Sequence, residues 1–119
     1  MSTFDWLLVA HLVGDFLFQS DKMAQKEHRF SALGIHALVY GLVQGVLLAF
    51  LAPSVTVWAV CVGWLLVTHM ILDTRHPVRR WMQIFGVTPN RPWLSIVFDQ
   101  VFHVVTLVPV AVWLDWLAG

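Results

Sequence analysis

The sequence predicts an all-α integral membrane protein, a four-helix bundle built from two parallel-repeat helical hairpins. Three observations lead to this prediction. Of the 119 residues, 59% are hydrophobic and only 12% are charged, with a mean hydropathy of +0.75, whereas soluble domains are nearer half apolar and a quarter charged. The apolar residues gather in four long runs, and one ten-residue motif occurs twice. We expect a single transmembrane domain over residues 1–119.

Four apolar spans are expected, at about residues 4–19, 31–52, 55–73 and 92–118. The first is short, because at 1.5 Å per residue it covers roughly 24 Å of a hydrocarbon core about 30 Å thick. Pro53 ends the helix before it, so a tight turn joins the second and third spans. Pro92 lies near the start of the fourth span, where proline is well tolerated.

The basic residues predict the orientation of the chain. With four spans, the connections at residues 20–29 and 74–91 lie on one side of the membrane, and basic loops mark the cytoplasmic side. We therefore expect a multi-pass protein of the inner membrane with both termini outside. The second connection also contains an amphipathic stretch suited to lying on the inner surface, with Val78, Trp81, Met82 and Phe85. Every Lys and Arg falls in these two connections: Lys22, Lys26, Arg29, Arg75, Arg79, Arg80 and Arg91.

These cations have two interpretations. In the first they set the topology and contact anionic lipids. In the second, one or more of the arginines at 75, 79, 80 and 91 hold a substrate phosphate at the mouth of a site.

The repeated motif places a histidine and an aspartate one helical turn apart. It reads Trp-Leu-Leu-Val-X-His-X-X-X-Asp, first with His11 and Asp15 and then with His69 and Asp73. Residues at i and i+4 share one face of a helix. Because the repeats lie in spans that run the same way, they predict two hairpins related by an axis along the membrane normal.

The fourth span carries the same pair in reverse order, as Asp99 and His103. That span runs outward, so its histidine again lies one turn deeper than its carboxylate. His36, near the start of the second span, falls at a comparable depth. The sequence thus predicts a layer of four histidines next to a layer of three aspartates in the cytoplasmic half of the bilayer.

Such residues are costly in a membrane. An aspartate at the centre of a membrane helix costs about 2.5–3.5 kcal/mol, and ionisable residues there usually face the bundle interior and mark a site. Imidazole and carboxylate are suitable ligands for zinc, and for manganese or iron as alternatives. We expect one or two divalent ions, with one aspartate bridging or acting as general base. The predicted ligands are His11, Asp15, His36, His69, Asp73, Asp99 and His103, and the predicted catalytic residues are Asp15, Asp73 and Asp99. A metal-free proton relay remains an alternative.

Further polar residues lie on the same helical stripes. They are expected either to orient the ligands or to form ordinary interhelical hydrogen bonds. The lone cysteine, Cys61, is expected to be a small buried apolar residue. The stripe residues are Gln19, Tyr40, Gln44, Thr68, Ser95 and Gln100. Two other histidines, His28 and His76, are expected to be solvated. The remaining acidic residues are expected to be surface charges: Asp5, Asp21, Glu27 and Asp115.

The chain resembles a known family over nearly its whole length. The resemblance rests on the motif His11-X-X-Gly-Asp15-Phe-X-X-Gln19, on His36, and on the pairs at 69 and 73 and at 99 and 103. That family comprises small bacterial and phage membrane proteins grouped as domain of unknown function 3307. A weaker similarity is to membrane-bound metal-dependent hydrolases, and this resemblance implies hydrolysis.

Three functions follow as hypotheses. The first is a metal-dependent hydrolase at the cytoplasmic interface, with membrane lipids as partners and a lipid or lipid-linked ester or phosphoester as substrate. The second is a metal- or proton-coupled transporter or channel subunit, which with four helices would need to form a homo-oligomer. The third is a structural protein whose metal only pins the helices together. No nucleic acid is expected as a partner.

Overall fold

The computed structural model describes residues 1–17, 30–87 and 92–119, and every element in these ranges is helical. The elements are α1 (Thr3–Leu12), the π-helical turn η1 (Val13–Leu17), α3 (Phe30–Leu51), α4 (Val55–Asp73), α5 (His76–Ile84) and α6 (Pro92–Ala118). The expected features at Gln19, Asp21, Lys22, Lys26, Glu27, His28, Arg29 and Arg91 lie outside the described residues.

Three of the expected spans are helices whose bounds lie within one residue of those expected. α4 and α6 coincide with the predicted ranges, and α3 differs by one residue at each end. In the described part of the chain, three helices are long and apolar enough to cross a membrane, at Ser31–Leu51, Val55–Asp73 and Trp93–Ala118. α4 begins after the turn at Pro53 because the Ser54 hydroxyl accepts a hydrogen bond from the backbone N–H of Val57, 3.2 Å away.

The first expected span differs from the others. α1 has 10 residues and η1 has 5, so together they cover at most about 23 Å, and they are not among the three helices suited to crossing a membrane. A capping box starts α1, in which Ser2 and Asp5 each accept a hydrogen bond from the other's backbone N–H. Leu7, Ala10 and His11 are buried on its inner face.

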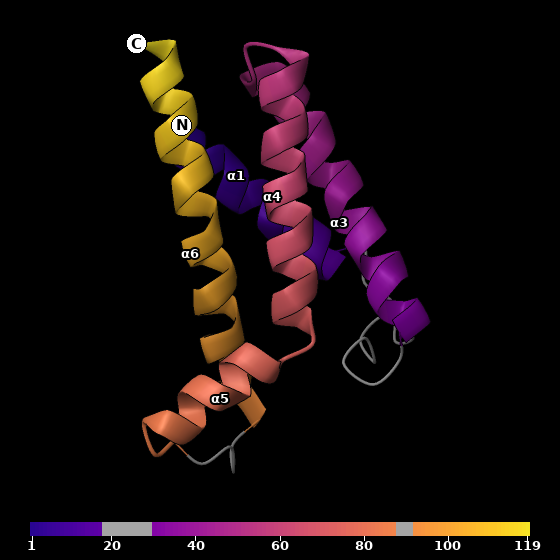
Figure 1. The fold of residues 1–119 in the computed structure, drawn as a ribbon, viewed down its shortest axis with the longest axis vertical. Coiled ribbons are helices and arrows are strands. Elements are labelled where there is room, and N and C mark those ends of the chain that lie inside the picture. The colour runs from indigo at the N-terminus through magenta and orange to yellow at the C-terminus, as the bar shows by residue number, and fades with distance from the viewer. Residues whose placement is uncertain (18–29, 88–91) are drawn as a thin grey trace.

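The helices pack in a ring. α1 contacts α3 and α6, and α4 contacts the same two helices from the other side (Figure 1). The core of this arrangement is apolar toward the chain termini and becomes polar toward the opposite end. Five large side chains with at most 1% exposure fill the apolar part: Leu7, Tyr40, Leu48, Leu65 and Leu107.

The outer faces of the long helices are also apolar. On α3, an exposed stripe at four-residue spacing consists of Leu38, Leu42, Val46 and Phe50. Four consecutive turns of exposed large apolar residues suit contact with lipid far better than contact with water. This stripe and the three long helices together indicate a membrane protein.

The chain termini lie at one end of the molecule and α5 at the other (Figure 1). The Thr3 hydroxyl donates a hydrogen bond of 2.6 Å to the Asp115 carboxylate, so the start of α1 is tied to the end of α6. Asp115 is exposed, as expected, but it also has this structural contact. α5 forms within the expected amphipathic stretch and buries Val78 and Met82 against its neighbours.

Candidate metal centre

All seven predicted ligand residues turn inward. Each is at most 4% exposed, and they come from α1, η1, α3, α4 and α6. Inward orientation was the central expectation, because a carboxylate facing lipid would have no partner. The structure nevertheless divides the seven into two groups of potential ligands and one residue that belongs to neither.

The larger group contains Asp15, His36, His69 and Asp73, whose ligand atoms all lie within 4.8 Å of one another. His36 Nε2 lies 2.9 Å from Asp15 Oδ1, 3.0 Å from His69 Nε2 and 3.3 Å from Asp73 Oδ2. His69 Nε2 lies 3.0 Å from Asp73 Oδ2 and 3.7 Å from Asp15 Oδ1. The four atoms therefore enclose one small volume.

These separations match the edges of a tetrahedral metal site. Zinc binds nitrogen and oxygen at about 2.0–2.2 Å, so the ligand atoms of a regular tetrahedron lie about 3.3–3.6 Å apart. The five separations between 2.9 and 3.7 Å fall around that value. Small adjustments of the side chains would place all four atoms at bonding distance from one ion.

Hydrogen bonds alone satisfy this arrangement poorly. An imidazole Nε2 carries at most one proton, yet His36 Nε2 has three polar atoms within 3.3 Å, one of which is the Nε2 of another ring. A cation at the centre would be attracted by all four groups. The Nδ1 atoms of His36 and His69 are buried without a hydrogen-bond partner in the described part of the chain. Each such atom costs about 1–3 kcal/mol, so the cluster is not arranged for stability alone.

The smaller group contains Asp73, Asp99 and His103. His103 Nδ1 lies 2.7 Å from the backbone carbonyl of Asp99, a contact in which Nδ1–H donates. A neutral ring then presents an unprotonated Nε2, and this atom lies 3.1 Å from Asp73 Oδ1. Two electron-rich atoms so close require either a proton between them, carried by the imidazole or by the carboxyl group, or a metal ion that both bind. A backbone carbonyl that fixes the tautomer is also typical of metal-binding histidines.

Asp73 belongs to both groups. Its Oδ2 faces His36 and His69, while its Oδ1 faces His103. A carboxylate with its two oxygens directed at two ligand sets has the geometry of a bridging ligand. The expectation of one bridging aspartate is therefore compatible with the position of Asp73.

His11 belongs to neither group, because both of its ring nitrogens have other partners. Nδ1 lies 2.8 Å from the Tyr40 hydroxyl, and Nε2 lies 2.9 Å from Gln100 Oε1. The Gln100 amide in turn donates to Asp15 Oδ2 at 2.8 Å, and the Gln44 amide donates to the Tyr40 hydroxyl at 3.3 Å. One consistent set of donors thus runs from Gln44 through Tyr40, His11 and Gln100 to Asp15. This chain orients the Asp15 carboxylate.

The π-helical turn explains why the two repeats differ. In the second repeat, His69 and Asp73 lie on a regular α-helix with their side-chain atoms 3.0 Å apart. In the first repeat, Asp15 lies in η1, and the corresponding separation from His11 is 3.9 Å. A π-turn is wider than an α-turn and often occurs at functional sites. It moves Asp15 toward His36 and leaves His11 beside Tyr40.

Among the other stripe residues, Tyr40, Gln44 and Gln100 contact the site as described. The Thr68 hydroxyl instead donates to the Trp64 carbonyl of its own helix, 2.8 Å away, and Cys61 is buried as expected. The bond from His103 to the Asp99 backbone was not predicted, although an i, i+4 pair ending in histidine makes such a contact possible.

The described residues thus form an all-helical protein with three helices suited to crossing a membrane, and the helices enclose a buried polar centre. The chain belongs to the family described as protein of unknown function (DUF3307), whose family model matches residues 3–118. No curated protein and no solved structure matches the chain, so the expected similarity to membrane-bound hydrolases has no counterpart in these comparisons.

Proposed function

We propose that this protein is an inner-membrane, metal-dependent hydrolase that acts at the cytoplasmic interface on a lipid or lipid-linked ester or phosphoester. One observation carries the proposal: four buried ligand atoms from Asp15, His36, His69 and Asp73 lie at nearly tetrahedral separations. Zinc is the ion that best suits two imidazoles and two carboxylates, with manganese or iron as alternatives.

The two ligand groups suggest different roles for two ions. The larger group offers four protein ligands, which is the closed coordination of a structural zinc site. The smaller group offers three, from Asp73, Asp99 and His103, and three protein ligands plus a water form the usual catalytic zinc site. The smaller group is therefore where we place the chemistry.

Asp73, Asp99 and His103 would hold the second ion, which would supply a bound water with its pKa lowered toward 7 as the nucleophile for the carbonyl carbon or phosphorus of the substrate. Asp99 Oδ1, which is buried without a hydrogen-bond partner among the described residues, is placed to accept the proton. The bond to the ester oxygen breaks, and Asp99 passes the proton to the leaving alcohol. Asp73 would offer a ligand to both ions, and Asp15 would offer one to the structural ion.

The architecture we propose is the four-helix bundle of two hairpins, with α1 and η1 in the first hairpin and both chain ends on the outer side of the inner membrane. Two features support it. In each hairpin, the carboxylate of the first helix contacts the histidine of the second helix. Asp15 Oδ1 lies 2.9 Å from His36 Nε2, and Asp73 Oδ1 lies 3.1 Å from His103 Nε2. The end of the molecule opposite the termini carries Arg75, Arg79 and Arg80, which suits the cytoplasmic side (Figure 1).

A purely structural metal is the second candidate, favoured by the closed four-ligand group. Its ligands come from η1, α3 and α4, so one ion would tie together three elements. Both candidates predict bound metal, and only the hydrolase predicts turnover.

The test is elemental analysis of protein purified in mild detergent without chelator, followed by mass spectrometry of lipid mixtures incubated with it. We expect at least one zinc, manganese or iron per chain, and less than about 0.3 per chain would contradict metal binding. His69→Ala should lose the ion of the four-ligand group, whereas His76→Ala, which changes an exposed histidine on α5, should retain the full metal content. Metal retained with no ester cleaved would favour the structural candidate.

A further inference from the structure

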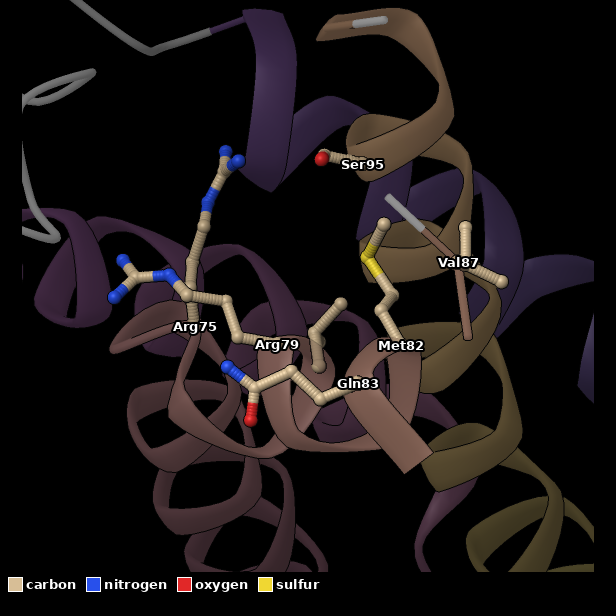
Figure 2. Close-up of a pocket in the computed structure, with 7 residues that line it drawn as sticks. Arg75, Arg79, Met82, Gln83, Val87 and Ser95 are labelled. Carbon is tan, nitrogen blue, oxygen red and sulfur yellow. The ribbon is translucent and has the colours of Figure 1, made fainter. Parts of the chain in front are cut away.

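A pocket of about 310 Å³ lies between α5, the end of α4 and the start of α6. Figure 2 shows that Arg75 and Ser95 face it from opposite sides. The residues that line it from the α5 side follow a helical spacing, so a single face of that helix forms one wall. The lining residues are Arg75, Val78, Arg79, Met82, Gln83, Val87 and Ser95.

The lining combines cations with neutral donors. Arg75 and Arg79 supply two guanidinium groups, and Gln83 and Ser95 add an amide and a hydroxyl, with no acidic residue among the seven. Guanidinium groups bind phosphate through paired, charge-assisted hydrogen bonds. Val78 and Met82, which are 2% and 3% exposed, add a buried apolar part to the lining.

The pocket adjoins the candidate metal centre. Ser95 lies one helical turn before Asp99 on the same face of α6, and Arg75 follows Asp73 by two residues. Arg75 also interacts electrostatically with Asp99. A group bound in the pocket therefore lies beside the three-ligand site, on the side of the molecule that carries the arginines.

The backbone conformation of Arg75 also supports a binding role for this residue. This residue has φ of 63° at the N-cap of α5, a left-handed conformation that is unfavourable for a non-glycine residue. Glycine or asparagine would adopt it at lower cost. Strain of this kind is often found at functional sites. Here it directs a guanidinium into the pocket immediately after the helix that carries Asp73.

We infer that this pocket binds the phosphate group of an anionic substrate, through Arg75 and Arg79, next to the metal centre. The inference rests on the proposed function for its substrate, but the binding itself does not require an intact metal site. The shared chemistry is a phosphate monoester, carried either by a lipid headgroup or by a soluble compound.

The test is competition binding in detergent. A fluorescent dihexanoyl phosphatidic acid is the probe, displaced by unlabelled dihexanoyl phosphatidic acid, by inorganic phosphate or by dihexanoyl phosphatidylcholine. The variant Arg75→Gln/Arg79→Gln should bind the probe roughly tenfold or more weakly, because it loses two charge-assisted contacts. Arg80→Gln is the matched control, since Arg80 is an exposed arginine on α5 that does not line the pocket. It should change binding less than about twofold.

Two further measurements use a single variant and chelator-treated protein. Arg79→Gln alone leaves the strained Arg75 position intact and should show part of the loss if the double variant is misfolded. Chelator-treated protein should retain most of the binding, and loss with chelator but not with the arginine variants would show that the metal holds the phosphate and overturn the inference. Equal loss in Arg80→Gln would also overturn it. Tighter binding of phosphatidic acid than of inorganic phosphate identifies a lipid substrate, and equal binding identifies a soluble one.

Discussion

The Nε2 atoms of His36 and His69 lie 3.0 Å apart in the interior of the protein. His69 comes from α4, where its ring stacks on Tyr40 at a centroid distance of 3.7 Å, so it has little freedom to turn away. Both rings direct Nε2 at the carboxylates of Asp15 and Asp73. Two imidazoles and two carboxylates held in this way form a candidate cation site with little freedom to rearrange.

Asp73 and Asp99 should have different effects on metal content. Asp73→Asn changes the carboxylate common to both ligand groups, so bound metal should fall to near zero. Asp99→Asn changes only the three-ligand group, so about one ion per chain should remain while ester hydrolysis is lost. Elemental analysis and lipid hydrolysis measured on the same preparations check this. Asp115→Asn, at the far end of α6, is the control, and equal metal loss in Asp99→Asn and Asp73→Asn would argue against two distinct ion sites.

Metal retention should fall as the pH falls. Imidazole binds a metal only when it is neutral, so protons compete with the ion for the histidine ligands. Affinity should therefore be higher at about pH 8 than at about pH 5. Because the ion stabilises the folded state, its contribution to stability is present at high pH and lost at low pH. Equilibrium dialysis and thermal unfolding with and without metal, at matched pH, measure both effects, and a pH-independent affinity would exclude histidine ligands.

Tyr40→Phe tests the chain of hydrogen bonds behind Asp15. The substitution leaves His11 Nδ1 and the Gln44 amide without the hydroxyl they contact in the core. We expect the free energy of unfolding to fall by about 1–3 kcal/mol, with metal still bound but more weakly, because Asp15 is less firmly oriented. Thr56→Val, which removes an exposed hydroxyl at the start of α4, should have almost no effect. Loss of all metal in Tyr40→Phe would instead point to a direct role for the tyrosine.

Gly14→Ala tests the close approach of η1 to α3. A Cβ at residue 14 would lie 3.1 Å from Tyr40 Cδ2 and 3.4 Å from Tyr40 Cα, so one of the two elements must shift. We expect a loss of about 1–3 kcal/mol in stability and weaker metal binding, since the shift displaces Asp15. The comparison is Gly63→Ala on α4, where a Cβ meets nothing within 4 Å and alanine should stabilise the helix by up to about 1 kcal/mol. Equal effects of the two substitutions would mean that the contact at Tyr40 is unimportant.

Much of the arrangement could be predicted because the polar residues are few and regularly spaced. The positions of Pro53 and Pro92 and the lengths of the apolar runs predicted α3, α4 and α6 to within a residue. The four-residue spacing of histidine and aspartate, read together with the direction of each span, predicted that these side chains would meet. Their burial confirms that they face inward.

What the spacing could not predict is the π-helical turn at Val13–Leu17. The first and second copies of the motif have the same spacing, so the sequence predicted equivalent positions for His11 and His69. The difference arises from tertiary packing, in which Gly14 allows η1 to approach Tyr40 closely and the widened turn moves Asp15. The roles of Gln100 and Tyr40 as links to Asp15 depend on the same shift.

The hydrogen bond between Thr3 and Asp115 has a practical consequence for work on living cells. Since the two ends of the polypeptide are adjacent, complementary fragments of a split fluorescent protein fused to them should reassemble within a single molecule, without help from a second copy. The fluorescence of such a fusion would then report directly which face of the bilayer holds both ends.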